Sequence, residues 1–464
     1  MKARVLVAVC GLAALGPERQ AQPGSIAITN VTVINPADTG APPRNQTILI
    51  RDGVIQEVGP AGRVRLPRDV RQVDGRGKFA IPGLWDSHVH FMNTGPSALP
   101  LLLAHGVTTV REMGGYLDST RAWQARMAAG LLAGPRIITP GPLLESSRYL
   151  QGVRERSAQP GQEQLAARVL PYRMGVEDAE AARRAIDSLA ALGVDFVKFR
   201  TVGSAEGYYA LLREAKRAGV PVAGHAPGVV GPETASDSGQ ADLEHAFFPP
   251  FTSLPPERRD SLIERLVRNG TWYTPTLVVS QAVTLSGDSA ERLIFGARAT
   301  ELDERRRYAS AWLLGWWRMQ VDERKADTSS ARARAVQEMY RSSLEDVRRM
   351  QAAGVRLLAG TDAGSVLVYP GFSLHEELAL LVYRAGLSSR QALRAATIEP
   401  ARFARLDDRF GTIAPGKVAD LVLLDADPFA DIRNTRRIFG VVQAGRWLGR
   451  GELDRMLQVI RTQD

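Results

Sequence analysis

Residue types that bind divalent metal ions stand at the ends of several predicted strands. His88 and His90 end the segment LWDSHVH, and side chains two residues apart leave the same face of a strand, so both rings can hold one ion. His225 ends VPVAGH, His245 ends ADLEH and Asp362 ends VRLLAGTD. Imidazole nitrogens and carboxylate oxygens are common ligands of catalytic metal ions. The pattern predicts a metal site to which several strand ends contribute.

A lysine interrupts another apolar strand. In GVDFVKFR, the residues Phe196, Lys198 and Arg200 alternate onto one side of the predicted strand, which puts the lysine inside the fold. A buried amine needs a partner, and unlike a guanidinium it can lose its proton and be derivatised. The alternative is a lysine at a strand end that reaches water or a neighbouring carboxylate. The first interpretation adds Lys198 to the metal site.

The elements that would position these residues alternate between strand-like and helical segments. Alternation of this kind, from residue 84 to about 404, is typical of βα units around a parallel sheet. The eight strand candidates fit a closed (β/α)8 TIM-like barrel, in which catalytic groups lie at the carboxyl ends of the strands. We therefore expect an α/β protein with its chemistry on one face of the barrel.

Both ends of the chain have a different pattern. Short alternating strands between Asn, Asp and Gly turns occupy residues 25–79 and 411–448, which predicts a small β-sandwich formed by the N- and C-terminal segments. The expected division is a signal peptide or disordered leader at 1–24, the N-terminal half of the β-sandwich at 25–80, the metal-dependent barrel at 81–405, and the C-terminal half of the β-sandwich with a tail at 406–464.

Two segments are longer than a simple connection between barrel elements requires. They cover residues 145–174 and 278–350, and both leave the face on which the metal site is expected. The second segment is helix-rich and carries Trp312, Trp316, Trp317 and Met319. Its apolar side either packs on the barrel or forms a lid over the substrate.

Six motifs give the chain a specific resemblance. In order they are GLWDSHVHF, HGVTTVREMGG, FVKF, AGHA, LEHA and AGTDAG, and they resemble successive strand motifs of the amidohydrolase superfamily. Within it the chain is similar to the metal-dependent Xaa-Pro dipeptidase and imidazolonepropionase-like group, over nearly all of its length. One departure is Glu112, in REMGG, where members of the family commonly have aspartate. This departure leaves the substrate class open.

The resemblance also implies a ligand set. In the lysine-containing branch of the superfamily the lysine is carboxylated and bridges two divalent metal ions, usually Zn²⁺. Carried over to this sequence, His88, His90 and Asp362 would bind one ion, His225 and His245 the other, and carboxylated Lys198 would lie between them.

The expected reaction follows from such a centre. Two ions held about 3.5–4 Å apart can share a hydroxide at neutral pH and polarise a carbonyl, so a metal-bridging hydroxide would attack an amide C–N bond with Asp362 as general acid and base. The resemblance favours a dipeptide or an N-acyl amino acid as the small-molecule substrate. The alternatives are a cyclic amide, lactone or other ester, deamination at a single metal, or a non-catalytic scaffold, which would have lost ligands.

Five further residues are candidates for contact with the substrate. Arg148, Tyr149, Arg200 and Tyr273 have side chains suited to a carboxylate or an oxyanion, and His375 follows the last barrel strand, where it can orient the Asp362 loop. Surface and packing roles are the alternatives for all five.

Composition and the N-terminus bear on partners and location. The formal charge is +9, from 59 basic and 50 acidic residues, and no block of like charges suggests binding to nucleic acid or to a membrane surface. An apolar run after Lys2 and Arg4 resembles a secretory signal and is too short to span a bilayer. It favours export to the periplasm or medium, and the alternative is a cytoplasmic protein. The single cysteine, Cys10, lies in this run, which argues against a cysteine nucleophile. The sequence leaves a homo-oligomer open.

Overall fold

The chain forms a closed barrel of parallel strands in the computed structural model, which describes residues 24–245, 254–326 and 329–461. Residues 1–23 of the leader expected to direct export, including Cys10, lie outside the described residues. The barrel strands are β6 (Leu84–Val89), β7 (Val107–Glu112), β8 (Arg136–Ile138), β9 (Leu143–Glu145), β11 (Val197–Phe199), β12 (Val222–Gly224), β13 (Asp242–Glu244), β14 (Trp272–Thr274) and β15 (Arg356–Leu357).

Neighbouring strands pair in the order that a barrel requires. One ladder joins β6, β7 and β8, and a second runs from β9 through β11, β12, β13 and β14 to β15. Backbone hydrogen bonds close the ring: Asp362 N donates to His88 O at 2.8 Å, and Asp195 N donates to Thr139 O at 3.0 Å. Segments β8 and β9 follow each other closely in the chain and occupy one position of the ring, because β8 pairs with β7 on one side and β9 pairs with β11 on the other. The nine segments therefore fill eight positions, and the predicted (β/α)8 architecture is confirmed.

Helices pack around the barrel, and local signals fix where they begin and end. Ser204 caps the start of α7 by accepting a hydrogen bond from Gly207 N, and Gly219 ends that helix with φ of 72°, a conformation that favours glycine. The outer helices are α2 (Ala98–Ala104), α3 (Leu117–Ala128), α6 (Ala179–Ala191), α7 (Ala205–Ala218), α8 (Pro232–Asp237), α10 (Pro256–Asn269), α15 (Ser330–Ala353), α16 (Phe372–Tyr383), α17 (Ser389–Ala395) and α18 (Ile398–Phe403).

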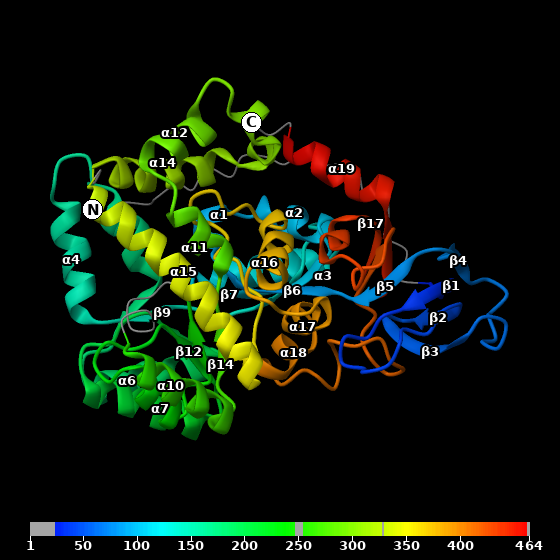
Figure 1. Cartoon of the computed structure of the whole chain (residues 1–464), viewed down its shortest axis with the longest axis horizontal. Coiled ribbons are helices and arrows are strands. Elements are labelled where there is room, and N and C mark those ends of the chain that lie inside the picture. Colours follow the sequence, from blue (N-terminus) through cyan, green and yellow to red (C-terminus); the bar gives the residue numbers. More distant parts are fainter. Residues whose placement is uncertain (1–23, 246–253, 327–328, 462–464) are drawn as a thin grey trace.

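Strands from both ends of the chain form one mixed sheet beside the barrel, at the right of Figure 1. Their order is β18-β17-β16-β5-β1-β2-β3, with β4 also pairing with β1. The strands are β1 (Ile26–Val33), β2 (Gln46–Arg51), β3 (Val54–Pro60), β4 (Arg71–Asp74), β5 (Phe79–Pro82), β16 (Leu421–Leu424), β17 (Ile438–Gln443) and β18 (Arg446–Gly449).

The sheet bends so that its two halves share one apolar core. Strand β1 changes register between Ile28 and Val31, and residues of β2 and β16, such as Ile50 and Leu423, belong to one buried cluster. The expected β unit from both termini is therefore present as one sheet continuous through β1. Only Gly83 separates β5 from β6, so this sheet holds the start of the strand that ends in His88 and His90.

Helix α14 (Ala311–Ala326) of the second long segment packs on the carboxyl face of the barrel. Trp317 is fully buried, its ring meets that of Tyr369 edge to face at 5.0 Å, and its Nε1 donates to Gly364 O at 3.1 Å. The segment also contains α11 (Leu277–Val283) and α12 (Gly287–Phe295), and α12 lies beside α14 in Figure 1. Trp317 therefore ties α14 to the loop that follows Asp362.

Among the described residues, no helix has both the length and the apolar composition needed to cross a membrane.

We predict that Trp317→Ala lowers the free energy of unfolding by roughly 3–5 kcal/mol, because it leaves a large cavity under α14. Trp312, on the same helix, is 51% exposed, and Trp312→Ala should cost less than about 1 kcal/mol. Chemical denaturation of both variants measures the difference. Equal losses would mean that α14 is not anchored through Trp317.

Candidate metal centre

Three predicted ligands meet at the carboxyl ends of β6 and β15. His90 Nε2 lies 3.1 Å from Asp362 Oδ1 and 3.3 Å from His88 Nε2, and His88 Nε2 lies 3.5 Å from the same carboxylate oxygen. One ligand atom from each of the three residues lies within 4.8 Å of the others. This spacing suits coordination of one divalent ion by His88, His90 and Asp362.

The other three predicted ligands lie beside the first group. The His245 ring centroid is 4.5 Å from that of His88 and 4.9 Å from that of His225. Lys198 is buried in the barrel, and its Nζ lies 3.6 Å from Glu244 Oε1. The structure thus brings together the six residues that the sequence predicts as ligands.

Two of the predicted ligands have unusual backbone conformations. His245 has φ of 70° and Asp362 has φ of 61°, both in the left-handed region that residues other than glycine seldom adopt. In a regular strand, Glu244 and His245 would point to opposite faces. The turn at His245 lets both consecutive side chains face the centre, where both contact or approach His88. Strain of this kind concentrates at functional sites.

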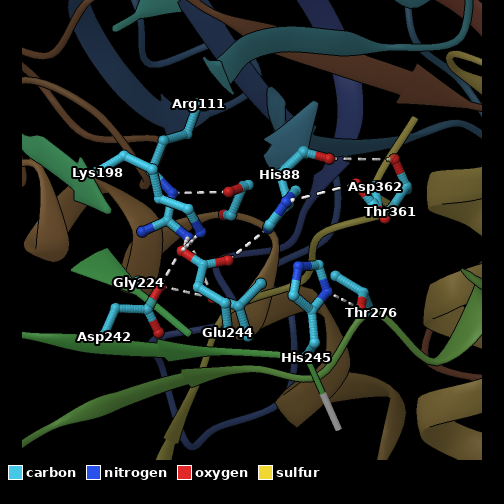
Figure 2. A network of polar contacts seen from close by, with 12 residues as sticks. His88, Arg111, Lys198, Gly224, Asp242, Glu244, His245, Thr276, Thr361 and Asp362 are labelled. Atoms are coloured by element: carbon cyan, nitrogen blue, oxygen red, sulfur yellow. Dashed lines mark hydrogen bonds and ion pairs between the residues drawn. The ribbon is translucent and has the colours of Figure 1, made fainter. Parts of the chain in front are cut away.

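Glu244 is a site residue that the sequence reasoning missed. Its Oε2 pairs with His88 Nδ1, and its Oε1 accepts a hydrogen bond from Arg111 Nη2 at 3.0 Å (Figure 2). Arg111 also donates to Asp242 Oδ2 at 2.6 Å and stands over the Phe403 ring at 4.5 Å. A carboxylate on the far nitrogen of a ligand histidine fixes the tautomer and the orientation of the ring. In the sequence, this role of Glu244 is indicated only by the position of an acidic residue directly before His245.

A second carboxylate holds the Asp362 loop. Asp86 accepts hydrogen bonds from Thr361 N at 3.0 Å and from Thr361 Oγ1 at 2.7 Å. Ser365 Oγ donates to Asp362 Oδ2 at 2.8 Å, and Thr276 Oγ1 lies 2.9 Å from His245 Nδ1. These contacts leave little rotational freedom to the ligands.

Burial sets the charge states of the ligands. It lowers the pKa of His88 to about 4 and holds the pKa values of His225 and His245 well below the ordinary value, so all three rings are neutral at pH 7. Burial also lowers the pKa of Lys198, although Glu244 opposes the shift. For Asp362 burial alone would raise the pKa, but His90 and His88 outweigh it and keep the pKa below its usual range.

These residues fit a metal centre. Neutral imidazoles and an ionised carboxylate are the forms in which histidine and aspartate bind metal ions. Lys198 Nζ is buried and donates no hydrogen bond to any described residue, so it has capacity for a further group. A set of nitrogen and oxygen ligands without thiolate suits Zn²⁺ and similar divalent ions.

A cavity of about 790 Å³ is lined by four of the predicted ligands, His90, His225, His245 and Asp362. Both long segments contribute to its outer wall, the first with Tyr149 and Tyr172, the second with Trp316 and Met319. On helix α14, Trp317 packs on the barrel, as one of the two interpretations of this segment expects, and Trp316 and Met319 line the cavity. The first segment includes α4 (Ser147–Ser157), α5 (Leu165–Val169) and β10 (Arg173–Gly175).

Of the five candidate substrate contacts, the structure brings two to the cavity. Tyr149 and Arg200 line it. Arg148 is exposed on α4 and does not line it. Tyr273 is fully buried in the main apolar core. His375 is buried on α16, with Nδ1 2.9 Å from Thr435 Oγ1 and Nε2 3.0 Å from His105 O, so it joins elements away from the cavity.

A parallel barrel with clustered histidines, a lysine and an aspartate at its carboxyl face is the arrangement of a metal-dependent hydrolase. The model of the Amidohydrolase family matches residues 79–448, and the chain belongs to this family. The family prediction from the strand motifs is confirmed.

Individual relatives are more distant. The chain is 24% identical to ochratoxinase of Aspergillus niger, over 88% of this chain and 83% of that protein. A solved Xaa-Pro dipeptidase with bound methionine has a TM-score of 0.68 and 20% identity, covering 92% of this chain and all of the other. Molinate hydrolase has a TM-score of 0.70 and 24% identity, covering 93% and 96%. These structural likenesses support the fold.

We predict that Glu244→Gln weakens metal binding by about 10- to 100-fold, because His88 loses the carboxylate that orients it. Glu112→Gln is the matched control. Glu112 is buried, accepts from Thr139 at 3.1 Å, and has its pKa raised to about 8 by burial, so glutamine resembles its protonated form. Competition with a chromogenic chelator measures both affinities. An unchanged metal affinity in Glu244→Gln would show that Glu244 does not orient His88 for metal binding.

Proposed function

We propose that this protein hydrolyses amide C–N bonds with two divalent metal ions, Zn²⁺ being the expected metal. His88, His90 and Asp362 would hold one ion, His225 and His245 the other, and a carboxylated Lys198 would lie between them. When bound, the ions supply Lewis-acid chemistry, lowering the pKa of a water molecule and polarising the scissile carbonyl. The observation that carries the proposal is that these side chains lie together: His88, His90 and Asp362 form one group, and the His245 ring lies beside those of His88 and His225. Four of the six, His90, His225, His245 and Asp362, line the cavity, whereas His88 and Lys198 are buried beneath it.

Asp362 is the residue proposed to move protons. Its carboxylate lines the cavity, and the histidines beside it lower its pKa and keep it ionised, which is the form that can take a proton from the attacking water. The same group would then donate that proton to the leaving amine as the tetrahedral intermediate collapses. The hydrogen bonds from Ser365 to Asp362 and from Thr361 to Asp86 keep the carboxylate in position through both transfers.

A dipeptide or an N-acyl amino acid is the proposed substrate. Support comes from the similarity to a Xaa-Pro dipeptidase, and from a cavity of about 790 Å³, a size typical of small-molecule sites. Its outer wall combines aromatic residues with arginine, which suits a substrate that has both an apolar side chain and a negative charge.

We predict that the Zn²⁺-loaded protein releases free amino acid from members of a panel of dipeptides and N-acetyl amino acids. Asp362→Asn keeps an oxygen for the metal but cannot shuttle the proton, so kcat should fall by about 10²–10⁴ with a modest loss of metal. Amine release and elemental analysis provide the two measurements. A loss of kcat below about tenfold at full metal content would assign the proton transfer to another group.

We also predict that Lys198 must be carboxylated to hold the second ion. Metal content should approach two ions per chain in the wild type and fall in Lys198→Ala, and short carboxylic acids should partly restore the activity of this variant. Lys198→Arg cannot form the carbamate and should stay inactive. Normal activity and metal content in Lys198→Arg would show that no carbamate is needed.

A further inference from the structure

Arg200 stands at the edge of the same cavity as the ligands. It follows β11, two residues after Lys198, so both side chains leave the same side of the strand. Lys198 is buried inside the barrel, whereas the Arg200 side chain is 32% exposed and lines the cavity. Two residues of strand advance the chain by roughly 6–7 Å, which places Arg200 one layer outside the ligands.

The guanidinium of Arg200 is held on two sides. Its Nε donates to Glu145 Oε1 at 2.7 Å, and its plane lies over the Tyr149 ring at 3.8 Å. Glu145 is fully buried and is fixed in turn by Thr201 Oγ1, which donates to Oε2 at 2.6 Å. An arginine stacked and paired in this way loses little entropy when it binds a ligand.

The terminal nitrogens of Arg200 remain available. Within the described part of the chain, neither Nη atom donates a hydrogen bond, and Nη2 is buried without a partner. A buried guanidinium nitrogen without an acceptor is costly unless a ligand supplies one. The Nη atoms of the rigid Arg200 guanidinium are therefore hydrogen-bond donors at the cavity wall that no described side chain uses.

The charge around Arg200 favours an anion. Glu145 is shared with Arg173, whose Nε donates to Oε1 at 3.3 Å, so one carboxylate faces two guanidinium groups. Arg173 also lines the cavity, and the pair leaves an excess of one positive charge on this wall. A planar carboxylate can accept two parallel hydrogen bonds from the guanidinium of an arginine. Hydrogen bonds between charged groups are also stronger than those between neutral groups.

We propose that Arg200, held by Glu145 and Tyr149, binds a free carboxylate of the substrate next to the scissile amide. One residue of an extended chain spans about 3.3–3.6 Å, so the carboxylate of the amino acid released by cleavage is the group within reach. The substrates would then be amides of amino acids with a free C-terminal carboxylate. This inference rests on the proposed amide hydrolysis and adds the group by which the substrate is recognised.

The test compares N-acetyl-L-phenylalanine with N-acetyl-L-phenylalaninamide, and glycyl-L-phenylalanine with its C-terminal amide. The wild type should prefer each carboxylate, and Arg200→Gln should lower kcat/KM for the carboxylates by roughly 10- to 100-fold, mainly through KM, while the amides change little. Arg200→Lys should recover only part of the preference, because lysine keeps the charge and loses the fork. Metal content and circular dichroism check that the variants are folded and loaded.

Arg156→Gln is the matched control for general electrostatics. Arg156 lines the same cavity, and its guanidinium forms no ion pair with a described residue, so its loss removes the same charge without disturbing the Glu145 group. Equal effects of Arg156→Gln and Arg200→Gln would overturn recognition by Arg200. So would a wild type that hydrolyses amides and carboxylates equally well, although the proposed function would then stand.

If the wild type hydrolyses none of the four compounds, the proposed function fails for this substrate class. Calorimetric binding of N-acetyl-L-phenylalanine to the wild type and to Arg200→Gln then decides the inference by itself. Binding that requires Arg200 and the carboxylate supports it, and binding that is absent or independent of Arg200 contradicts it.

Discussion

The inside of this barrel must accommodate several buried charges, and their mutual neutralisation is the condition on which the centre depends. Lys198, Arg111, Asp242 and Glu244 are all buried, and a single unpaired charge there would cost several kcal/mol. Arg111 forms ion pairs with both carboxylates, while among the described residues Lys198 lies within 4 Å of one carboxylate, that of Glu244. Lys198 Nζ donates no hydrogen bond to any described residue, so Glu244 is only a partial partner for the amine. A site that adds a carboxyl group to Lys198 and surrounds it with metal ions would satisfy it.

The rest of the fold keeps the strand ends in register around this centre. The terminal sheet leads through Gly83 into the strand that ends in His88 and His90, and Trp317 fastens α14 to the loop after Asp362. Left-handed backbone at His245 and Asp362 then turns these two candidate ligands toward the centre, whereas a regular strand would point them elsewhere. The ligands are therefore positioned by elements from the whole length of the chain.

The sequence predicts the barrel and the six candidate ligands because polar residues at the ends of apolar strands are a local pattern, and the motif resemblance gives their order. Glu244 could not be predicted in this way, because regular strand alternation places its side chain on the face opposite to that of His245. No local sequence pattern indicates the positive φ of His245, which brings the two side chains to the same side. Arg111 is another case, since only the closed barrel brings it to Asp242 on a strand four positions away in the ring.

Contacts at the cavity wall were the least predictable feature of the site. The position of Arg200 at the cavity can be predicted from its spacing to Lys198. Tyr273 and His375 have equally suitable side chains, but both are buried away from the cavity. Which side chains reach the cavity depends on how the segments 145–174 and 278–350 fold over the barrel, and their packing is decided by tertiary contacts such as that of Trp317 with Tyr369.

Diffraction from crystals grown with Zn²⁺, recorded at the zinc absorption edge, tests the account most directly. We expect two anomalous peaks per chain, one against His88, His90 and Asp362 and the other against His225 and His245, with electron density extending from Lys198 Nζ between them. A single peak at full zinc occupancy beside an unmodified Lys198 would contradict the proposed centre.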